Sequence, residues 1–255
     1  MNQIPSIVLA GGRASPELAA QIGTPVRALG RFQGRPLIEI VVDALRAAQP
    51  AAPITVVGDV PDRACCKRVP DQGGFVANIL AGLALHRDAD WALFVSADLP
   101  FLTGEVIERF VSEALAASAG AQVVYPIVAV AACYARYPGI KRTTVRLREG
   151  EFTGGNVMLA RPSFFLDRQA LLADAYAARK RPVRLAAMLG AGTVARLLFS
   201  QLVSPRALSV EELERRVGRF VRADVRALIS ASPELATDLD RPSDFAAAER
   251  FAAPD

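Results

Sequence analysis

Ser6-Ile-Val-Leu-Ala-Gly-Gly-Arg13 is the stretch of sequence that decides the fold. Its apolar residues 7–10 predict a short buried strand, which Gly11 and Gly12 end abruptly. Glycine tolerates positive φ angles and lets a ligand approach bare backbone N–H groups, and Arg13 adds a positive charge beside them. Because ligands in open α/β sheets bind at the carboxyl ends of strands, this corner predicts a site for an anion such as phosphate. The alternative is a strand followed by a tight turn that binds nothing, which would show the same sequence pattern.

The alternation of strands and helices around this corner predicts the fold class. The expected strands are residues 7–10, 54–57, 91–95 and 121–127, and the expected helices between them are residues 36–49, 75–86 and 103–115. Repeated strand–helix–strand units form a parallel sheet with helices on both faces. We therefore expect a three-layer α/β fold with a mostly parallel sheet, in a single domain of residues 1–255 whose halves are residues 1–127 and 128–255.

The remaining segments follow a less regular pattern. Loops are expected at residues 61–70 and 134–141, strands at 143–147, 152–160 and 225–229, and an extended segment at 235–240. Helices are expected at residues 162–179, 183–189 and 194–202, after a capping box at 209–212, and at 245–251 with Ser243 as the cap.

The composition excludes several classes of function. Of the 255 residues, 52% are hydrophobic and 22% are charged, which is ordinary for a globular chain. No apolar run reaches the length of a membrane span and residues 1–10 do not resemble a signal peptide, so we expect a cytoplasmic protein without a membrane partner. The net charge is +4, but no basic run is interleaved with aromatic residues, so we expect no nucleic-acid partner. The three cysteines and one histidine lack the spacing of a zinc site, and the sequence does not predict the oligomeric state.

A candidate metal ligand follows the third expected strand. Asp98 comes just after residues 91–95, where the ligand crevice of the sheet should lie. A carboxylate there suits Mg²⁺, which prefers one or two carboxylates together with phosphate oxygens, although Asp98 could instead cap the following helix. A second ligand must come from the later half of the chain. Asn156 is favoured because it follows two glycines, and Asp238 and Asp240 are the alternatives.

The long loop at residues 14–34 and the helix at residues 75–86 add further candidates. The loop carries Arg27, whose guanidinium suits a phosphate. Gly82 weakens the helix by about 1 kcal/mol relative to alanine, which either a close approach to a ligand or simple packing against the sheet would explain. The chain carries neither a P-loop nor a dinucleotide-binding glycine motif.

Three parts of the first half, in the right order, resemble the signature of one enzyme family. They are Leu9-Ala-Gly-Gly-Arg13 with Arg27-Ala-Leu29 and Phe32-Gln-Gly-Arg-Pro-Leu-Ile-Glu39, then Asn78-Ile-Leu-Ala-Gly-Leu83, and then Ser96-Ala-Asp-Leu-Pro-Phe-Leu-Thr103. This pattern is similar to that of nucleotidyltransferases related to molybdenum cofactor guanylyltransferase. Arg27 stands where that family usually has lysine.

The resemblance implies the fold of nucleotide-diphospho-sugar transferases. It also implies transfer of a nucleotidyl group from an NTP to a small phosphorylated acceptor, with release of pyrophosphate and with Mg²⁺ as cofactor. The first half would bind the nucleotide and the second half the acceptor. Catalysis would use Arg13, Arg27 and Asp98, and the metal would be held by Asp98 with Asn156. The nucleotide would be contacted by Leu9, Ala10, Gly11, Gly12, Gly73, Gly74, Asn78 and Gly82.

Two other functions are compatible with the sequence. A glycosyltransferase that uses a nucleotide-sugar often carries two aspartates around one residue at the metal strand, whereas Ser96-Ala-Asp98 has one. A regulator that binds a nucleotide without turnover is the other alternative. The sequence does not identify the base of the NTP or the acceptor.

Overall fold

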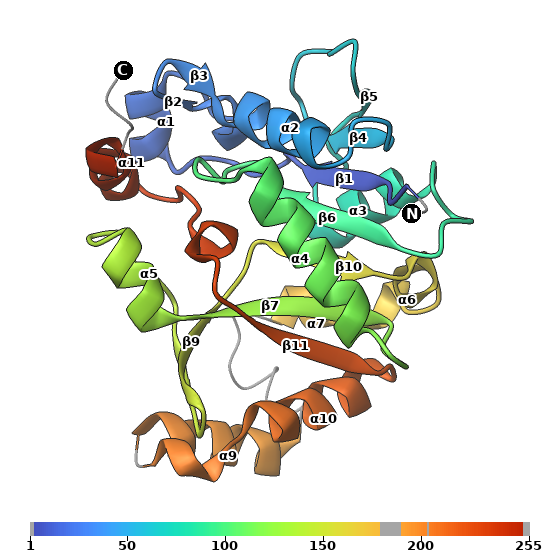
Figure 1. The fold of residues 1–255 in the computed structure, drawn as a ribbon, viewed down its shortest axis with the longest axis vertical. Helices are drawn as coiled ribbons and strands as arrows, with labels where there is room; N and C mark the ends of the chain where they lie inside the picture. Colours follow the sequence, from blue (N-terminus) through green and yellow to red (C-terminus); the bar gives the residue numbers. More distant parts are fainter. Residues whose placement is uncertain (1–2, 179–189, 203, 252–255) are drawn as a thin grey trace.

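Nine strands form one continuous sheet through the described part of the chain (Figure 1). The computed structural model describes residues 3–178, 190–202 and 204–251. The strands of the sheet are β1 (Ser6–Leu9), β4 (Ile54–Val57), β5 (Lys67–Val69), β6 (Ala92–Ser96), β7 (Val123–Ala129), β8 (Val145–Leu147), β9 (Gly150–Gly154), β10 (Val157–Ala160) and β11 (Val225–Ser230). Their order is β5-β4-β1-β6-β10-β7-β9-β8, and β11 pairs with β7. The short strands β2 (Arg31–Phe32) and β3 (Arg35–Pro36) pair with each other outside this sheet.

The parallel sheet expected around β1 is confirmed. β1 pairs in parallel with β4 on one side and with β6 on the other. Successive side chains of β1 point to opposite faces of the sheet, so Val8 packs into one hydrophobic cluster and Ile7 into another. A strand that is buried on both faces needs a continuous apolar run, and this run is why the strand could be predicted from the sequence.

Helices cover both faces, so the three-layer architecture is also confirmed. α2 (Leu37–Ala48) and α4 (Gly104–Ala117) pack against each other on the face that contains Val8. α3 (Phe75–Leu83) and α6 (Pro162–Leu166) lie on the face that contains Ile7 (Figure 1). The hydroxyl of Thr103 accepts a hydrogen bond from the backbone N–H of Val106 at 3.3 Å, which starts α4 where the sequence predicts it.

The second half departs from the parallel pattern. β10 is antiparallel both to β6 and to β7, and β9 is antiparallel to β7. β11 restores a parallel pair with β7. Because β10 runs against β6, its first residues lie beside the carboxyl end of β6. The antiparallel insertion therefore delivers Asn156 to the edge of the sheet where Asp98 lies.

Further helices extend around this core. They are α1 (Pro16–Ile22), α5 (Val130–Arg136), α7 (Gln169–Ala178), α9 (Ala191–Leu202), α10 (Val210–Val221) and α11 (Pro242–Ala248). Ser209 caps α10 as expected, because its Oγ accepts a hydrogen bond from Glu212 N at 3.1 Å, which is one of the two bonds of a capping box. Within the residues described, no helix is both long and apolar enough to cross a membrane.

Several expected boundaries are wrong. β5 lies inside the expected loop at residues 61–70, because its sequence Lys-Arg-Val is mostly charged and gives no apolar signal at the edge of the sheet. α5 extends to Arg136, into the expected loop at residues 134–141. The helix expected at residues 162–179 is two helices, since α6 ends at Leu166 and α7 begins at Gln169.

The C-terminal segment also differs in detail. Residues Pro233–Ala236 form a short 3₁₀ helix where an extended chain was expected from residue 235. α11 begins at Pro242, with Arg241 and not Ser243 at the N-cap, because the Asp244 carboxylate accepts from the Arg241 backbone N–H at 3.0 Å. The helix expected at residues 183–189 lies outside the described residues.

Candidate active site

Three aspartates gather at the edge of the sheet where β6 ends. Carboxylate oxygens of Asp98, Asp238 and Asp240 lie within 4.8 Å of one another, and these residues are called the acidic cluster below. Asp98 is only 3% exposed, and its Oδ1 accepts a hydrogen bond from Ser96 Oγ at 2.5 Å. The sequence places Asp98 correctly at the carboxyl end of β6.

Backbone hydrogen bonds join the distant segments that build the acidic cluster. Leu239 N donates to Asp98 O at 3.2 Å, which fixes the C-terminal segment beside the end of β6. Asn156 joins the same edge, because its N–H donates to Leu235 O at 2.6 Å and its carbonyl accepts from Ser96 N at 2.9 Å. The cluster is therefore held by the main chain, and its geometry does not depend on the side chains alone.

Arg27 supplies the positive charge that the acidic cluster needs. Its Nε lies 2.7 Å from Asp98 Oδ2, and its Nη1 forms an ion pair with Asp240 Oδ1. Burial lowers the pKa of Arg27, but the attraction of Asp98, Asp240 and Asp238 more than offsets this, so the pKa is raised. The guanidinium stays charged and bridges two of the carboxylates.

Asp238 is the most strongly perturbed member of the cluster. Burial raises its pKa to about 7, and the like charges of Asp98 and Asp240 add to the shift. The side-chain amide of Asn156 donates to Asp238 Oδ1 at 3.0 Å. The structure thus brings together the two aspartates that were the alternatives for the second metal ligand, and it places Asn156 as a hydrogen-bond donor to one of them.

Gly11 and Gly12 form the adjoining corner, and one of the two reasons expected for glycine there, a positive φ angle, is wrong. Neither has a positive φ angle, so the turn itself does not require glycine. Close approach requires it. A Cβ on Gly11 would lie 2.4 Å from Asn78 Nδ2, and a Cβ on Gly12 would lie 2.9 Å from Arg27 Nη2. The corner therefore carries no side chains of its own, because those of Asn78 on α3 and Arg27 in the long loop fill the space that a Cβ would need.

Asn78 organises the loop before α3. This loop carries Asp71, which the sequence did not single out as a site residue. Asn78 Nδ2 donates to Asp71 Oδ1 at 2.7 Å, and Asn78 Oδ1 accepts from the backbone N–H of Gln72 at 2.7 Å. Gly73 needs glycine, since its φ is 76°, and Gly74 is the N-cap of α3. A carboxylate beside Gly11 is therefore a fixed feature of the corner. A lone Asp71 in a loop carried no signal in the sequence.

Gly82 lies elsewhere. A Cβ on Gly82 would lie 2.6 Å from Ile7 Cγ2 and 3.1 Å from Val57 Cγ2. Gly82 is thus in contact with the core strands β1 and β4, which supports the packing alternative over the contact with a nucleoside. Leu9 and Ala10 precede the corner at the end of β1, and Ala10 is buried.

The arginines of the long loop have different positions. Arg13 is exposed, and its backbone forms a bridge with Val26 that ties the corner to the start of the Arg27 segment. Arg27 N donates to Gly12 O at 3.0 Å. In contrast, Arg31 donates to Gly34 O, and Arg35 pairs with Asp43 on α2. Of these four, Arg27 is the one whose side chain enters the acidic cluster.

A pocket of about 320 Å³ lies beside the acidic cluster. Its walls come from β7, the loop before β8, the Gly154-Gly155-Asn156 turn and the C-terminal segment. A Cβ on Gly154 would lie 2.6 Å from Tyr125 Oη, so the turn packs directly against this tyrosine. Burial, with the charge of Asp238, raises the pKa of Tyr125 to about 12, and its neutral hydroxyl donates to Gly155 O.

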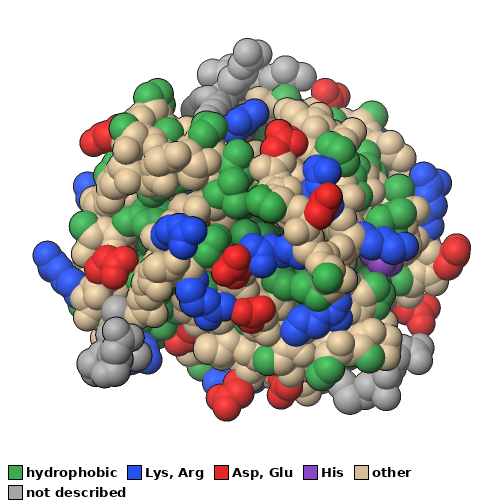
Figure 2. Space-filling model, turned by 90° about the horizontal axis from the view of Figure 1, so that it is seen from above, with side chains coloured by type: hydrophobic (Ala, Val, Ile, Leu, Met, Phe, Trp, Pro, Cys, Tyr) green, Lys and Arg blue, Asp and Glu red, His purple; other side chains and the backbone are tan. Residues whose placement is uncertain are grey.

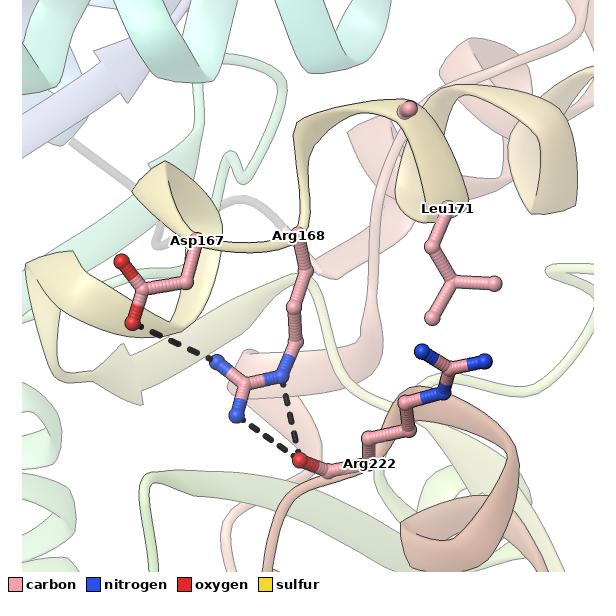
Figure 3. Close-up of a pocket in the computed structure, with 5 residues that line it drawn as sticks. Asp167, Arg168, Leu171 and Arg222 are labelled. Atoms are coloured by element: carbon pink, nitrogen blue, oxygen red, sulfur yellow. Dashed lines mark hydrogen bonds and ion pairs between the residues drawn. The ribbon is translucent and has the colours of Figure 1, made fainter.

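A second cavity, of about 350 Å³, lies between α6, α7 and the end of α10 (Figure 3). There Arg168 Nη2 donates to Arg222 O at 2.7 Å, which satisfies a carbonyl at the C-terminus of α10. None of the residues predicted for the site line this cavity. Figure 2 shows one face of the molecule, on which acidic and basic side chains alternate and no extended patch of one charge is visible.

Comparisons with known proteins place this chain among the nucleotide transferases and identify its family. Residues 6–200 match the family described as the MobA-like NTP transferase domain. The chain belongs to this family, as the resemblance in its first half implied.

Individual relatives agree with this assignment. The chain is 34% identical over 148 residues to molybdenum cofactor guanylyltransferase of Rhodopseudomonas palustris (strain BisB5). The matched region covers 51% of this chain and 67% of that protein. A hypothetical transferase from Thermus thermophilus is 38% identical, with a TM-score of 0.82 over 95% of this chain and 99% of that one. The 2-C-methyl-D-erythritol 4-phosphate cytidylyltransferase of Thermus thermophilus is 15% identical with a TM-score of 0.54, over 98% of each chain, and shares the fold.

Proposed function

We propose that this chain transfers a nucleotidyl group from an NTP to a small phosphorylated acceptor and releases pyrophosphate. The observation that carries the proposal is the acidic cluster with Arg27 bridging it, directly beside the bare Gly11–Gly12 corner. The phosphates of a nucleotide at this corner would lie next to the Arg27 guanidinium and next to a cation held by the acidic cluster. The reaction belongs to the general activity of the family, and its substrates are the part proposed here.

The donor set of the acidic cluster fits a hard divalent cation. Carboxylate oxygens are the ligands that Mg²⁺ prefers, and three of them within 4.8 Å leave room for coordination that phosphates and water complete. Arg27 pairs with Asp98 and Asp240 but carries a single positive charge, so it leaves negative charge in the cluster for a divalent cation to balance. Mg²⁺ held by Asp98 with Asp240 or Asp238 would neutralise charge on the α-phosphate and on the pyrophosphate leaving group.

We assign Asn156 a supporting role, as the donor that orients Asp238, in place of direct coordination. Gly11 and Gly12 would offer backbone N–H groups to the nucleotide, together with Leu9 and Ala10. Asp71 and Asn78 would contact the nucleoside part of the nucleotide.

In this reaction the protein has to position the two substrates and to stabilise negative charge. An oxygen of the acceptor phosphate attacks the α-phosphorus in line, a new P–O–P bond forms, and the bond to the β-phosphate bridging oxygen breaks as pyrophosphate leaves. No general base is required, because the acceptor phosphate is already ionised. Arg27 would move from the carboxylates toward the phosphates, while Arg13 adds charge from the exposed side of the corner.

The proposed function is tested in two steps. A thermal-shift screen of the four NTPs with Mg²⁺ should find at least one that stabilises the protein, since a ligand of the native state raises its apparent stability. Pyrophosphate release should then require that NTP and a phosphorylated acceptor, which separates this reaction from glycosyl transfer. Tight binding of the NTP, without release of pyrophosphate in the presence of any phosphorylated acceptor, would contradict the proposed enzyme activity and favour a nucleotide-binding regulator.

A further inference from the structure

The pocket beside the acidic cluster has an unusual chemistry for a small-molecule site. Such sites span about 300–1,000 Å³ and have mostly apolar walls. This one, at about 320 Å³, is small, and nearly all of its walls are polar or glycine backbone. Among the described residues that line it, Tyr125 is the one aromatic residue and Ala236 the one aliphatic residue. A ligand that fills it must therefore be compact and must form hydrogen bonds.

The cations of the pocket are not all used by the protein. Arg142 is part of the wall, where its Nη2 donates to Thr237 Oγ1 at 2.8 Å and its Nη1 donates to Ala236 O. Lys141 and Arg241 are exposed, and neither side chain forms an ion pair or a hydrogen bond with any described residue. Two positive charges are thus available to a ligand at the pocket.

The carboxylates of the pocket, in contrast, are already occupied. Asp244 accepts from the backbone N–H of Arg241 at 3.0 Å. Asp238 and Asp240 belong to the acidic cluster, where Arg27 and a bound divalent cation would balance their charge. Once Asp238 and Asp240 are balanced in this way, the lining carries Lys141, Arg142 and Arg241 against the single carboxylate of Asp244, so the net charge that faces a ligand is positive and favours an anion.

The walls also disfavour a flat ring system. A fused aromatic ring binds best between two apolar or aromatic faces, and this wall offers one aromatic ring, that of Tyr125, with no second one opposite it among the described lining residues. Thr143 and Thr153 add hydroxyl groups on the wall, and Thr153 Oγ1 donates to Thr143 O at 3.0 Å. Hydroxyl groups of a ligand would find partners here, and a large apolar surface would not.

We propose that the acceptor is a phosphate monoester of a small polyhydroxylated aliphatic molecule, whose anionic end is held by Lys141 and Arg241. This inference rests on the proposed function and makes it more specific. It distinguishes a compact aliphatic acceptor from one that carries a fused ring system, because the walls of the pocket, and not the nucleotide corner, decide between them. The pocket shares Asp238 and Asp240 with the acidic cluster, so a phosphate bound there lies next to the proposed reaction centre.

The test is a calorimetric titration with glycerol 3-phosphate as the probe. The protein is first saturated with Mg²⁺ and the α,β-methylene analogue of the NTP that stabilises it most. Glycerol 3-phosphate should then bind, and Lys141→Met and Arg241→Met should each weaken its binding at least tenfold without changing the affinity for the nucleotide analogue. Lys67→Met, which removes an exposed lysine on β5, is the matched control and should bind the probe like the wild type.

Three results would overturn the inference while leaving the proposed function in place. They are no binding of glycerol 3-phosphate to the nucleotide-loaded protein, equal binding by the wild type and both pocket variants, and tighter binding of a pterin that carries the same phosphate group. Failure of the nucleotide analogue to bind would contradict the proposed function itself, and the inference with it.

Discussion

The two sides of the candidate site are built in different ways. On the proposed nucleotide side, the key groups follow two neighbouring parallel strands, Gly11 and Gly12 after β1 and Asp98 after β6. On the proposed acceptor side, the walls come from β7, a loop, an antiparallel turn and a segment near the C-terminus. The first side depends on the order of the sheet, and the second on hydrogen bonds between segments that are far apart in the sequence. A change on the first side should therefore affect chemistry, and a change on the second should affect the choice of acceptor.

The largest effect is expected for Asp98→Asn. Asparagine keeps the shape of the side chain and can still accept from Ser96 Oγ, but it removes the charge that faces Arg27 and the proposed metal. Turnover should fall by at least about 10²–10³-fold, as for loss of one preorganised electrostatic group. Circular dichroism should show an unchanged fold. Asp62→Asn, at an exposed aspartate paired with Arg68, should have wild-type turnover. Normal turnover of Asp98→Asn would remove Asp98 from the mechanism.

Arg27→Ala should give two opposite effects. Loss of a charge-assisted phosphate contact of about 1.5–3 kcal/mol should slow turnover or weaken NTP binding about 10- to 100-fold. Without nucleotide, however, the variant should bind Mn²⁺ about tenfold more tightly, because the cation no longer competes with the guanidinium for Asp98 and Asp240.

Both effects of Arg27→Ala have a matched comparison. Arg31→Ala removes a neighbouring arginine that is hydrogen-bonded to Gly34 O, so it should change neither property. Arg13→Ala should weaken NTP binding without raising Mn²⁺ affinity, because Arg13 lies outside the cluster. Unchanged NTP binding and turnover in both Arg13→Ala and Arg27→Ala would contradict the phosphate role of this loop.

A third pair of variants separates packing from binding. Gly82→Val should lower the free energy of unfolding by about 1–3 kcal/mol through overpacking against Ile7, with a smaller effect on NTP affinity. Gly11→Ala should do the reverse, because its new methyl group would displace Asn78 and Asp71 at the corner. Ala81→Val controls for the cost of a β-branched residue in α3. Thermal unfolding and NTP titration of the same samples would decide, and a loss of affinity without a loss of stability in Gly82→Val would return Gly82 to the nucleotide site.

The smallest effect concerns the second metal ligand. Asp240→Asn should raise the Mg²⁺ concentration for half-maximal rate about tenfold or more, since it removes a carboxylate of the cluster. Asn156→Ala should raise it only a few-fold, because it removes a donor to Asp238 and not a ligand. The opposite order in a Mg²⁺ titration would restore Asn156 as the ligand.

The part of the fold that follows from the sequence is the part with an apolar signal. β1, β4 and β6 are buried on both faces, so their unbroken apolar runs predict both their positions and the parallel sheet. β5 gave no such signal, because charged residues dominate this strand at the edge of the sheet. A strand was expected at residues 152–160, but the antiparallel direction of β10 could not be predicted, since a short apolar run does not specify direction.

The same contrast holds for the site. Asp98 was predictable because it follows a recognisable strand, and the two glycines because they end one. The positions of Asp238 and Asp240 depend on the contact between Leu239 N and Asp98 O, which joins residues far apart in the chain and has no local signature. The close packing of Gly82 on Ile7 is likewise a tertiary fact that helix periodicity does not contain.

The central claim is that the glycine corner and the acidic cluster bind one metal–nucleotide complex. A crystal structure with Mn²⁺ and the α,β-methylene analogue of the stabilising NTP tests this most directly, because manganese has an anomalous signal. We expect an anomalous peak between Asp98 and its partner aspartates, bound also to an α-phosphate oxygen, with the nucleoside beside Gly11 and Arg27 turned toward the phosphates. A nucleotide bound at the corner with no metal at the acidic cluster, or a metal there with the nucleotide elsewhere, would contradict the claim.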